Sequence, residues 1–250
     1  MNLLLLAAGK SSRIYEKIKK NKCLIKINNN TLIKHIINKC KNSLIKNIYV
    51  VTGFKPQNIK KELKKIKNIK YINNDKYHST DMVYSSILAL KKSKSDTLIS
   101  YTDIFYTEKI FEIFSKSKKK FITIPYIKNW KKIWKLRKKN IFQDAETFRM
   151  DKNLNLKEIG KKINQKNLKH INGQFLGVIF IPKKYIKTVI NKYKILGNKK
   201  LQFTQFINHL IKFKVKIKCE EYNDFWYEFD DYEDLNNFKK LKNINKNNKK

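Results

Sequence analysis

The first stretch of the chain groups residues that can bind phosphate. Residues 3–13 read LLLLAAGKSSR, in which the leucines indicate a buried strand and Gly9 frees the backbone for a tight turn. Ser11 and Ser12 would present N–H groups at a helix start, where anions bind, and Arg13 adds a fixed positive charge. The stretch favours a phosphate-binding loop, although an ordinary serine-capped turn fits the same residues. It matches neither a Walker loop nor the dinucleotide-binding fingerprint.

Later segments offer groups that would complete a site for a nucleotide and a metal ion. Lys22 follows closely enough to reach the same phosphates. Asp103 ends the predicted strand DTLISYTD, and Glu228 and Asp230 share one face of the extended stretch WYEFDD. Carboxylate oxygens are the ligands that Mg²⁺ prefers, so these residues indicate a magnesium–nucleotide site. The alternative is that either aspartate caps a helix.

Strand and helix patterns alternate through the first half of the chain. Strands are predicted in LLLL, NIYVVTGF, IKYINN, DTLISYTD and KFITIPY, and helices in TLIKHIINKCK, KPQNIKKELKKIK, STDMVYSSILALKK and TEKIFEIFSKSK. This alternation predicts parallel βαβ units with right-handed crossovers. Ligands of such sheets bind beyond the carboxyl ends of the strands, which is where the candidate groups would meet.

In the second half of the chain, predicted strands and helices no longer alternate regularly. ETFRMDKNLNLKEIG predicts a hairpin that turns at DKN, GQFLGVIFIP and VKIKCEEY predict strands, and LQFTQFINHLIKF predicts a helix. YEFDDYEDLNNFKKLK leads into a last helix. We find no repeat and no linker, so we expect one mixed α/β domain over residues 1–240, followed by a frayed polar tail at 241–250.

The composition restricts the class of protein. A net charge of +38 suggests a nucleic-acid binder, but only Arg13, Arg137 and Arg149 are arginine among 58 basic residues, and the lysines are scattered. We therefore expect no specific nucleic-acid partner. Three widely spaced cysteines form no metal-ligand or disulfide pattern, which favours a cytoplasmic protein with reduced thiols. No apolar run is long enough for a membrane span, and LLLLAA is too short for a secretion signal.

Several of these stretches resemble one family. LLLLAAGKSSRI resembles the signature loop of the nucleotidyltransferases (MobA-like NTP transferases), and NKCLIKINNNTLIKHII is similar to their next segment. NNDKYHSTDMVYSSILAL resembles a stretch of the phosphocholine-type cytidylyltransferases, and NWKKIWKLR, DAE, LKEIGKKI and GQFLGVIFI resemble a middle region of that branch. The chain departs from the pattern at Asn21, where the family has proline, and at Asp81, where the branch has asparagine.

The resemblance implies a fold and a reaction. The fold would be a three-layer α/β/α, Rossmann-like (GT-A-like) nucleotidyltransferase fold with a mostly parallel mixed sheet. The reaction would be Mg²⁺-dependent transfer of CMP from CTP to a small phosphorylated or phosphonylated amine, such as phosphocholine, aminoethylphosphonate or an amino-acid or amide phosphate. Pyrophosphate would leave. The acceptor's own phosphate oxygen is already an anion, so no strong general base is required.

Other functions stay open at this point. A sugar-1-phosphate or molybdenum-cofactor type of nucleotidyltransferase would use another nucleoside triphosphate. A non-catalytic nucleic-acid-binding protein is a more distant alternative. A glycosyltransferase is disfavoured because SYTD carries one carboxylate where Asp-x-Asp is typical. No membrane partner is expected, and a homodimer is one assembly that the sequence leaves open.

The resemblance also implies roles for individual residues. Arg13 and Lys22 would be catalytic and bind the triphosphate, and Asp103 and Asp230 would hold Mg²⁺. The residues expected to bind the nucleotide are Leu6, Ala7, Ala8, Gly9, Ser11, Ser12, Ser79, Thr80 and Asp81.

The residues considered for the acceptor are Trp130, Trp134, Arg137, Asp144, Glu146 and Glu228. The tryptophans could form an aromatic cage for a quaternary ammonium, although tryptophans four apart on a helix more often pack in a core. Arg137 with Asp144 and Glu146 suits a zwitterionic phosphorylated amine and equally suits a structural ion-pair network.

Overall fold

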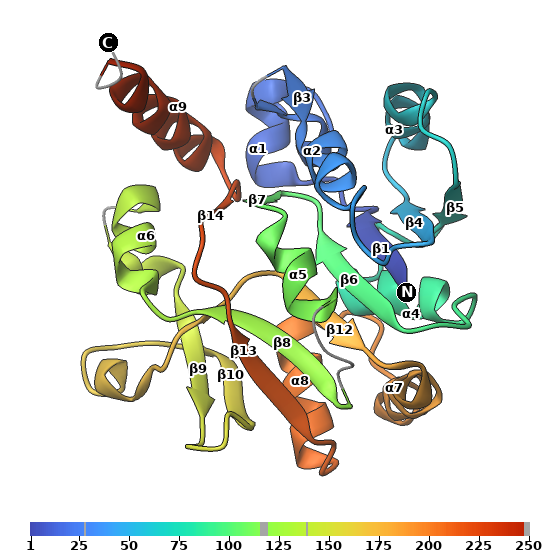
Figure 1. The fold of residues 1–250 in the computed structure, drawn as a ribbon, viewed down its shortest axis with the longest axis vertical. Coiled ribbons are helices and arrows are strands. Elements are labelled where there is room, and N and C mark those ends of the chain that lie inside the picture. Colours follow the sequence, from blue (N-terminus) through green and yellow to red (C-terminus); the bar gives the residue numbers. More distant parts are fainter. Residues whose placement is uncertain (28, 116–119, 139, 248–250) are drawn as a thin grey trace.

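The computed structural model describes residues 1–27, 29–115, 120–138 and 140–247, and within them an eight-stranded mixed sheet runs through the centre of the fold (Figure 1). Its strands are β1 (Asn2–Ala7), β4 (Asn47–Thr52), β5 (Ile69–Asn73), β6 (Thr97–Tyr101), β8 (Ile122–Ile127), β11 (Gln174–Phe175), β12 (Val178–Ile181) and β13 (Ile217–Glu221). They follow the order β11, β8, β12, β6, β1, β4, β5, and β13 pairs with β8 outside this path. Strands β6, β1, β4 and β5 are mutually parallel, as the alternating pattern predicted.

Helices cover both faces of this sheet. Alternate residues of a strand point to opposite faces, and in β1 Leu3 and Leu5 belong to one buried cluster while Leu4 and Leu6 belong to another. The first cluster includes side chains of α2 (Leu32–Lys39), α3 (Pro56–Leu63) and α5 (Lys109–Ser115), and the second includes side chains of α4 (Met82–Leu90), α7 (Lys183–Leu196) and α8 (Phe203–Lys212). This three-layer arrangement confirms the predicted α/β/α fold class.

The predicted hairpin is present between β9 (Glu146–Met150) and β10 (Leu156–Lys162), which pair antiparallel. Its turn is held by the Asp151 carboxylate, which accepts hydrogen bonds from the backbone N–H groups of Asn153 and Asn155. The acceptance of several hydrogen bonds stabilises the ionised carboxylate and keeps the pKa of Asp151 well below its usual range.

The segment GQFLGVIFIP forms two short strands, where the sequence predicted one. Gln174 of β11 pairs with Ile127, whereas Phe180 of β12 pairs with Thr123. The chain therefore bulges at Leu176–Gly177, where Gly177 has φ +77°. A Cβ at this position would lie 2.7 Å from the Tyr101 ring, so the close approach to Tyr101 also requires glycine.

The C-terminal segment returns across the sheet to the start of the chain. Strand β14 (Trp226–Glu228) pairs antiparallel with β7 (Ile104–Tyr106), and α9 (Tyr232–Asn247) follows. Figure 1 shows α9 beside α1 (Ser12–Ile18) and α6 (Trp130–Arg137), and α9 contacts each of these two helices. The helix reaches Asn247, so much of the segment expected to form the tail is helical, and residues 248–250 lie outside the described residues. That the chain is one domain stays a prediction.

Several elements were missing from the sequence-based expectation. The largest is α7, and the others are β7, β14, the short strands β2 (Lys26–Ile27) and β3 (Asn30–Thr31), and 3-10 helices at Lys22–Leu24, Ile141–Gln143 and Leu168–His170. Among the helices that the structure describes, none combines the length and the apolar character needed to cross a bilayer.

Candidate active site

A cavity of about 320 Å³ lies beyond the carboxyl ends of β1 and β6. It is lined by Leu6, Ala7, Ala8, Gly9, Ser11, Arg13, Asn21, Lys22, Cys23, Asn74, Tyr77, Thr80, Asp81, Met82, Ser85, Tyr101, Thr102, Asp103, Glu228 and Asp230. Most of the residues predicted to bind the nucleotide are therefore brought together around one cavity. Ser12 and Ser79 are not among the lining residues.

The loop after β1 is held by its neighbours on both sides. The backbone N–H of Phe54 donates to the Ala8 carbonyl at 2.9 Å, and the Thr102 hydroxyl donates to the Leu6 carbonyl at 2.7 Å. Gly53 permits this contact, because a Cβ there would lie 2.7 Å from the Ala8 oxygen. At Ser11 the backbone is left-handed, with φ 56°, and α1 begins with the next residue. The chain thus turns sharply and leaves the Gly9–Ser11 backbone at the cavity.

Asn21, which replaces the family's proline, has a structural role in this loop. Its side chain is buried and donates from Nδ2 to the Phe54 carbonyl at 2.7 Å. The 3-10 helix at Lys22–Leu24 begins at the next residue. Asn21 therefore connects the segment that carries Lys22 to Phe54, which in turn bonds to the loop after β1. This hydrogen bond holds the segment of Lys22 in position without the proline.

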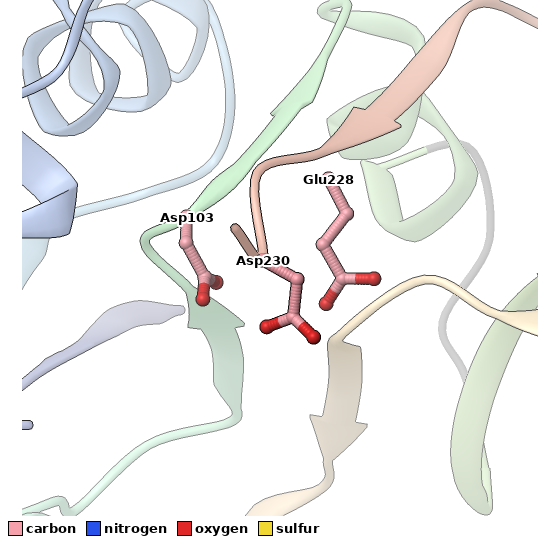
Figure 2. Close-up of side chains that lie close together, drawn as sticks. All are labelled: Asp103, Glu228 and Asp230. Carbon is pink, nitrogen blue, oxygen red and sulfur yellow. The ribbon is translucent and has the colours of Figure 1, made fainter. Parts of the chain in front are cut away.

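Three carboxylates lie close together in the cavity that the loop after β1 also lines. Oxygens of Asp103, Glu228 and Asp230 all lie within 4.8 Å of one another (Figure 2). Strand pairing explains the arrangement, since Glu228 of β14 is opposite Ile104 of β7 and the Phe229 N–H donates to the Asp103 carbonyl at 2.9 Å. The Phe229 side chain is buried between α1 and α9, so Glu228 and Asp230 point the other way, toward the cavity.

Two cationic side chains face these carboxylates. The Lys22 ammonium lies 2.9 Å from Asp103 and 3.2 Å from Asp230, and Arg13 binds both oxygens of Asp230 at 2.6 and 3.0 Å. The Lys22 side chain is 9% exposed, whereas that of Arg13 is 68% exposed. Burial opposes the charge on Lys22, but Asp103 and Asp230 outweigh it and raise the Lys22 pKa. Lys22 is therefore a fixed positive charge in the site.

The carboxylates themselves differ in electrostatic environment. Burial acts to raise the pKa of Asp230, but the charges of Lys22 and Arg13 outweigh it and lower that pKa. For Glu228 the balance is reversed: burial raises its pKa well above the usual value, despite the Arg137 guanidinium 3.2 Å away. Three carboxylates this close together, with Lys22 and Arg13 paired to two of them, offer the oxygen ligands that a hard divalent cation prefers.

Another side of the cavity is formed by the start of α4, where the residues predicted to lie near the nucleoside are found. Asp81 caps this helix, its carboxylate accepting the Met82 N–H at 2.7 Å, so the residue is both a helix cap and a lining residue. Asn74 donates to the hydroxyl groups of Thr80 and Ser85, at 3.0 Å each. Asn74 was not singled out from the sequence, although the stretch NNDKYH that contains it was.

Most of the residues predicted to bind the acceptor do not line the cavity. Trp130 and Trp134 are buried at 2% and 3% exposure, so their faces are covered by protein. Arg137 is fully buried and forms ion pairs, one of them with Asp144 at 3.0 Å. Of the ion-pair network of Arg137 with Asp144 and Glu146 that the sequence left as an alternative, the described residues show the pair with Asp144 and none with Glu146. Of the six residues, all of which the structure describes, Glu228 alone lines the cavity, and a role for the others in binding the acceptor stays a prediction.

Tyr101 was overlooked, although it stands at the carboxyl end of β6. Its ring lies in edge contact with Phe175 and Phe203, and its hydroxyl makes no hydrogen bond to any residue that the structure describes. Burial raises its pKa, and so do the carboxylates that surround it: Glu228, Asp103, Glu146 and Asp81. Burial also raises the pKa of Glu146 to about 7. Tyr101 therefore shares the cavity lining with the carboxyl groups of Asp81, Asp103 and Glu228, whereas Glu146 is not a lining residue.

The loop after β1, two cations and three carboxylates thus lie together at one end of a three-layer sheet. Residues 3–148 match the family model of the MobA-like NTP transferase domain, and the chain belongs to this family. The CTP:phosphoglutamine cytidylyltransferase of Campylobacter jejuni is 32% identical over 251 residues, covering 94% of this chain and 98% of the relative.

Solved structures show the same fold at low sequence identity. A CTP:phosphocholine cytidylyltransferase from Streptococcus pneumoniae has a TM-score of 0.71 at 17% identity, covering 96% of this chain and 98% of its own. The inositol-1-phosphate CTP transferase from T. maritima has a TM-score of 0.76 at 18% identity, covering 94% and 91%. At these identities the likeness establishes the fold alone.

Proposed function

We propose that the protein is a Mg²⁺-dependent cytidylyltransferase that transfers CMP from CTP to a small phosphorylated amine and releases pyrophosphate. One observation carries the proposal: Lys22 and Arg13 meet Asp103, Glu228 and Asp230 beside the backbone of the first loop. This arrangement supports binding of a triphosphate together with a divalent cation. Transfer by the phosphoglutamine enzyme of Campylobacter jejuni, at 32% identity, supports CTP as the donor.

The surroundings of Tyr101 support an acceptor that bears a nitrogen group. Tyr101, whose hydroxyl makes no hydrogen bond to a described residue, lines the same cavity as the carboxyl groups of Asp81, Asp103 and Glu228. Such groups attract an ammonium and accept hydrogen bonds from an amide, whereas they repel a second anionic group. A phosphorylated amine or amide therefore fits better than an acceptor whose far end is acidic. The proposal extends to an amide phosphate because the Campylobacter relative is named for phosphoglutamine.

The chemistry follows from the charges of the site. An oxygen of the acceptor's phosphate attacks the α-phosphorus of the nucleotide in line, and the bond to the pyrophosphate oxygen breaks. Lys22 and Arg13 stabilise the negative charge that moves onto the leaving pyrophosphate. Asp103, Glu228 and Asp230 would hold the magnesium ion, which supplies charge neutralisation at the phosphoryl oxygens when bound. No general base is required, because the attacking oxygen is already ionised.

A matrix of substrates tests this function. Pyrophosphate release is measured for CTP, UTP, GTP and ATP, each with phosphocholine, aminoethylphosphonate, phosphoglutamine and glucose-1-phosphate. We expect release with CTP and at least one nitrogen-bearing acceptor. A preference for GTP or UTP, or for the sugar phosphate, would overturn the assignment of donor or acceptor.

We also propose that the enzyme works in the cytoplasm, where CTP is available. Cys23, Cys40 and Cys219 are free and buried, which supports a reducing compartment. Whether the chain forms a homodimer stays a prediction, and sedimentation of the purified protein measures it.

A further inference from the structure

One buried arginine lies directly behind the carboxylate cluster. Arg137 has no exposed side-chain surface, and its guanidinium carbon is 5.0 Å from the Trp134 ring centre and 5.6 Å from that of Trp226. The two rings stack on each other at 5.4 Å with their planes 13° apart. The guanidinium therefore packs against two indole rings, with no surface left to water.

These donors meet carboxylates from three different segments. Nη1 donates a hydrogen bond to Asp144 at 3.0 Å and Nη2 donates one to Asp234 at 3.5 Å. Nη2 also forms an ion pair with Glu228 at 3.2 Å, and Nε lies 3.3 Å from Asp234 without a hydrogen bond between them. Glu228 is one of the three candidate metal ligands. Arg137 therefore contacts one ligand directly while it lies outside the cavity lining itself.

The contact with Asp234 connects Arg137 to a second ligand. Asp234 is fully buried, and its carboxylate accepts hydrogen bonds from the backbone N–H groups of Asp230 at 2.8 Å and Asp231 at 3.2 Å. The Asp231 carboxylate in turn accepts the Asp234 N–H at 3.1 Å, which closes a reciprocal cap at the start of α9. The backbone that carries Asp230 is thus held by a carboxylate whose charge Arg137 balances.

The charge balance of this cluster makes the arginine necessary. In the described part of the chain, Arg137 and Lys138 are the two cations that pair with four carboxylates, those of Asp144, Glu228, Asp231 and Asp234. Lys138 pairs with Asp231 at 2.5 Å and with Asp234 at 3.3 Å, and no ion pair joins it to Glu228. Among the described residues, Arg137 is the cation that forms an ion pair with Glu228, so its loss would leave Glu228 without a direct ion-pair partner.

We infer that Arg137 is a positioning residue, which orients Glu228 directly and Asp230 through Asp234 for binding of the divalent cation. The inference deepens the proposed function, because it rests on the same carboxylates acting as metal ligands. Arg137 touches neither nucleotide nor acceptor in this role. The role requires a guanidinium, whose charge is spread over three nitrogens and can pair with three carboxylates at once, whereas a lysine offers a single ammonium group.

The test compares Arg137→Lys and Arg137→Met with the wild type and with Lys138→Met. The control removes the adjacent cation of the same cluster and leaves the Glu228 contact intact. Mn²⁺ is titrated into each protein without nucleotide, and the free ion is followed by its electron paramagnetic resonance signal. Thermal unfolding is recorded for each variant in parallel, and Arg137→Lys keeps the test valid if Arg137→Met does not fold.

We expect Arg137→Lys to bind Mn²⁺ about 10- to 100-fold more weakly than the wild type, as is typical when a partner of a metal ligand is lost. Lys138→Met should keep Mn²⁺ affinity within a few-fold. Arg137→Lys with wild-type Mn²⁺ affinity and a lowered melting temperature would show a merely structural residue and overturn the inference, as would a wild-type protein that binds no Mn²⁺. Weakened Mn²⁺ binding in a protein that transfers no CMP to any acceptor would instead overturn only the proposed function.

Discussion

Replacement of Lys22 by methionine tests how the site uses its buried cation. The ammonium lies 2.9 Å from Asp103 and 3.2 Å from Asp230, and the side chain is 9% exposed. Breaking a buried ion pair costs about 3–5 kcal/mol. Asp103 and Asp230 remain 23% and 15% exposed, and Arg13 still pairs with Asp230, so we expect a cost near the lower end, about 3 kcal/mol.

The same substitution should affect catalysis more strongly than stability. Loss of one charged donor at the reacting phosphates costs about 10²- to 10³-fold in kcat. A stability loss of about 3 kcal/mol corresponds to a melting temperature lower by about 6–12 °C for a chain of this size. Differential scanning fluorimetry measures the second quantity, and pyrophosphate release at saturating CTP and acceptor measures the first.

Lys19→Met is the matched control, because Lys19 pairs with Glu16 at 2.8 Å and both side chains are about two-thirds exposed, at 67% and 68%. An exposed pair contributes little, so this variant should keep both the wild-type melting temperature and the wild-type kcat. The reasoning fails if Lys22→Met retains wild-type kcat, since the buried ammonium would then have no role at the phosphates. It also fails if Lys19→Met is damaged equally.

Three further predictions follow from single contacts. Gly53→Ala should lower the free energy of unfolding by about 1–3 kcal/mol and raise the KM for CTP, because the added Cβ would lie 2.7 Å from the Ala8 oxygen. Gly197→Ala is the control and should leave the KM for CTP unchanged, because no atom lies within 4 Å of its added Cβ. Burial raises the Glu146 pKa from 4.5 to about 7, so the stability that its protonated form contributes is present below pH 4.5 and is lost as the pH rises through 7. Glu146→Gln should therefore gain up to about 3 kcal/mol relative to the wild type at pH 8 compared with pH 4.5, measured by urea unfolding at both values; an identical difference at both would contradict it. Asp103→Asn should abolish pyrophosphate release, as should EDTA, and added Mg²⁺ should restore release only in the EDTA-treated wild type.

The first half of the fold was predictable because its strands are buried on both faces. The segment LLLL is a continuous apolar run, DTLISYTD contains the apolar residues Leu98, Ile99 and Tyr101, and the helices between such strands carry apolar stripes. Helix α7 was missed although its buried residues Ile186, Val189 and Tyr193 recur at helical spacing in KKYIKTVINKYKIL. Strands β7 and β14 have three residues each, too few for any period, and they exist because the two segments pair with each other.

The sequence could predict those site residues that follow directly after predicted strands or loops at one edge of the sheet. Lys22, Asp103 and Asp230 follow elements that converge at one edge of the sheet, and the sequence identified all three as a group. Arg137 could not be assigned in the same way. Its residue type suits either a substrate or an ion-pair network, and only the packing of α6 against α9 and β14 shows which carboxylates surround it.

The most direct test of the central claim is the identity of the reaction product. The protein is incubated with CTP, Mg²⁺ and a nitrogen-bearing phosphate acceptor, and the mixture is followed by ³¹P nuclear magnetic resonance. The account predicts one pyrophosphate per turnover and a new pair of mutually coupled signals from the linkage between the CMP phosphorus and the acceptor phosphorus. Formation of CMP and pyrophosphate without that linked product, or an unchanged spectrum with every acceptor, would contradict it.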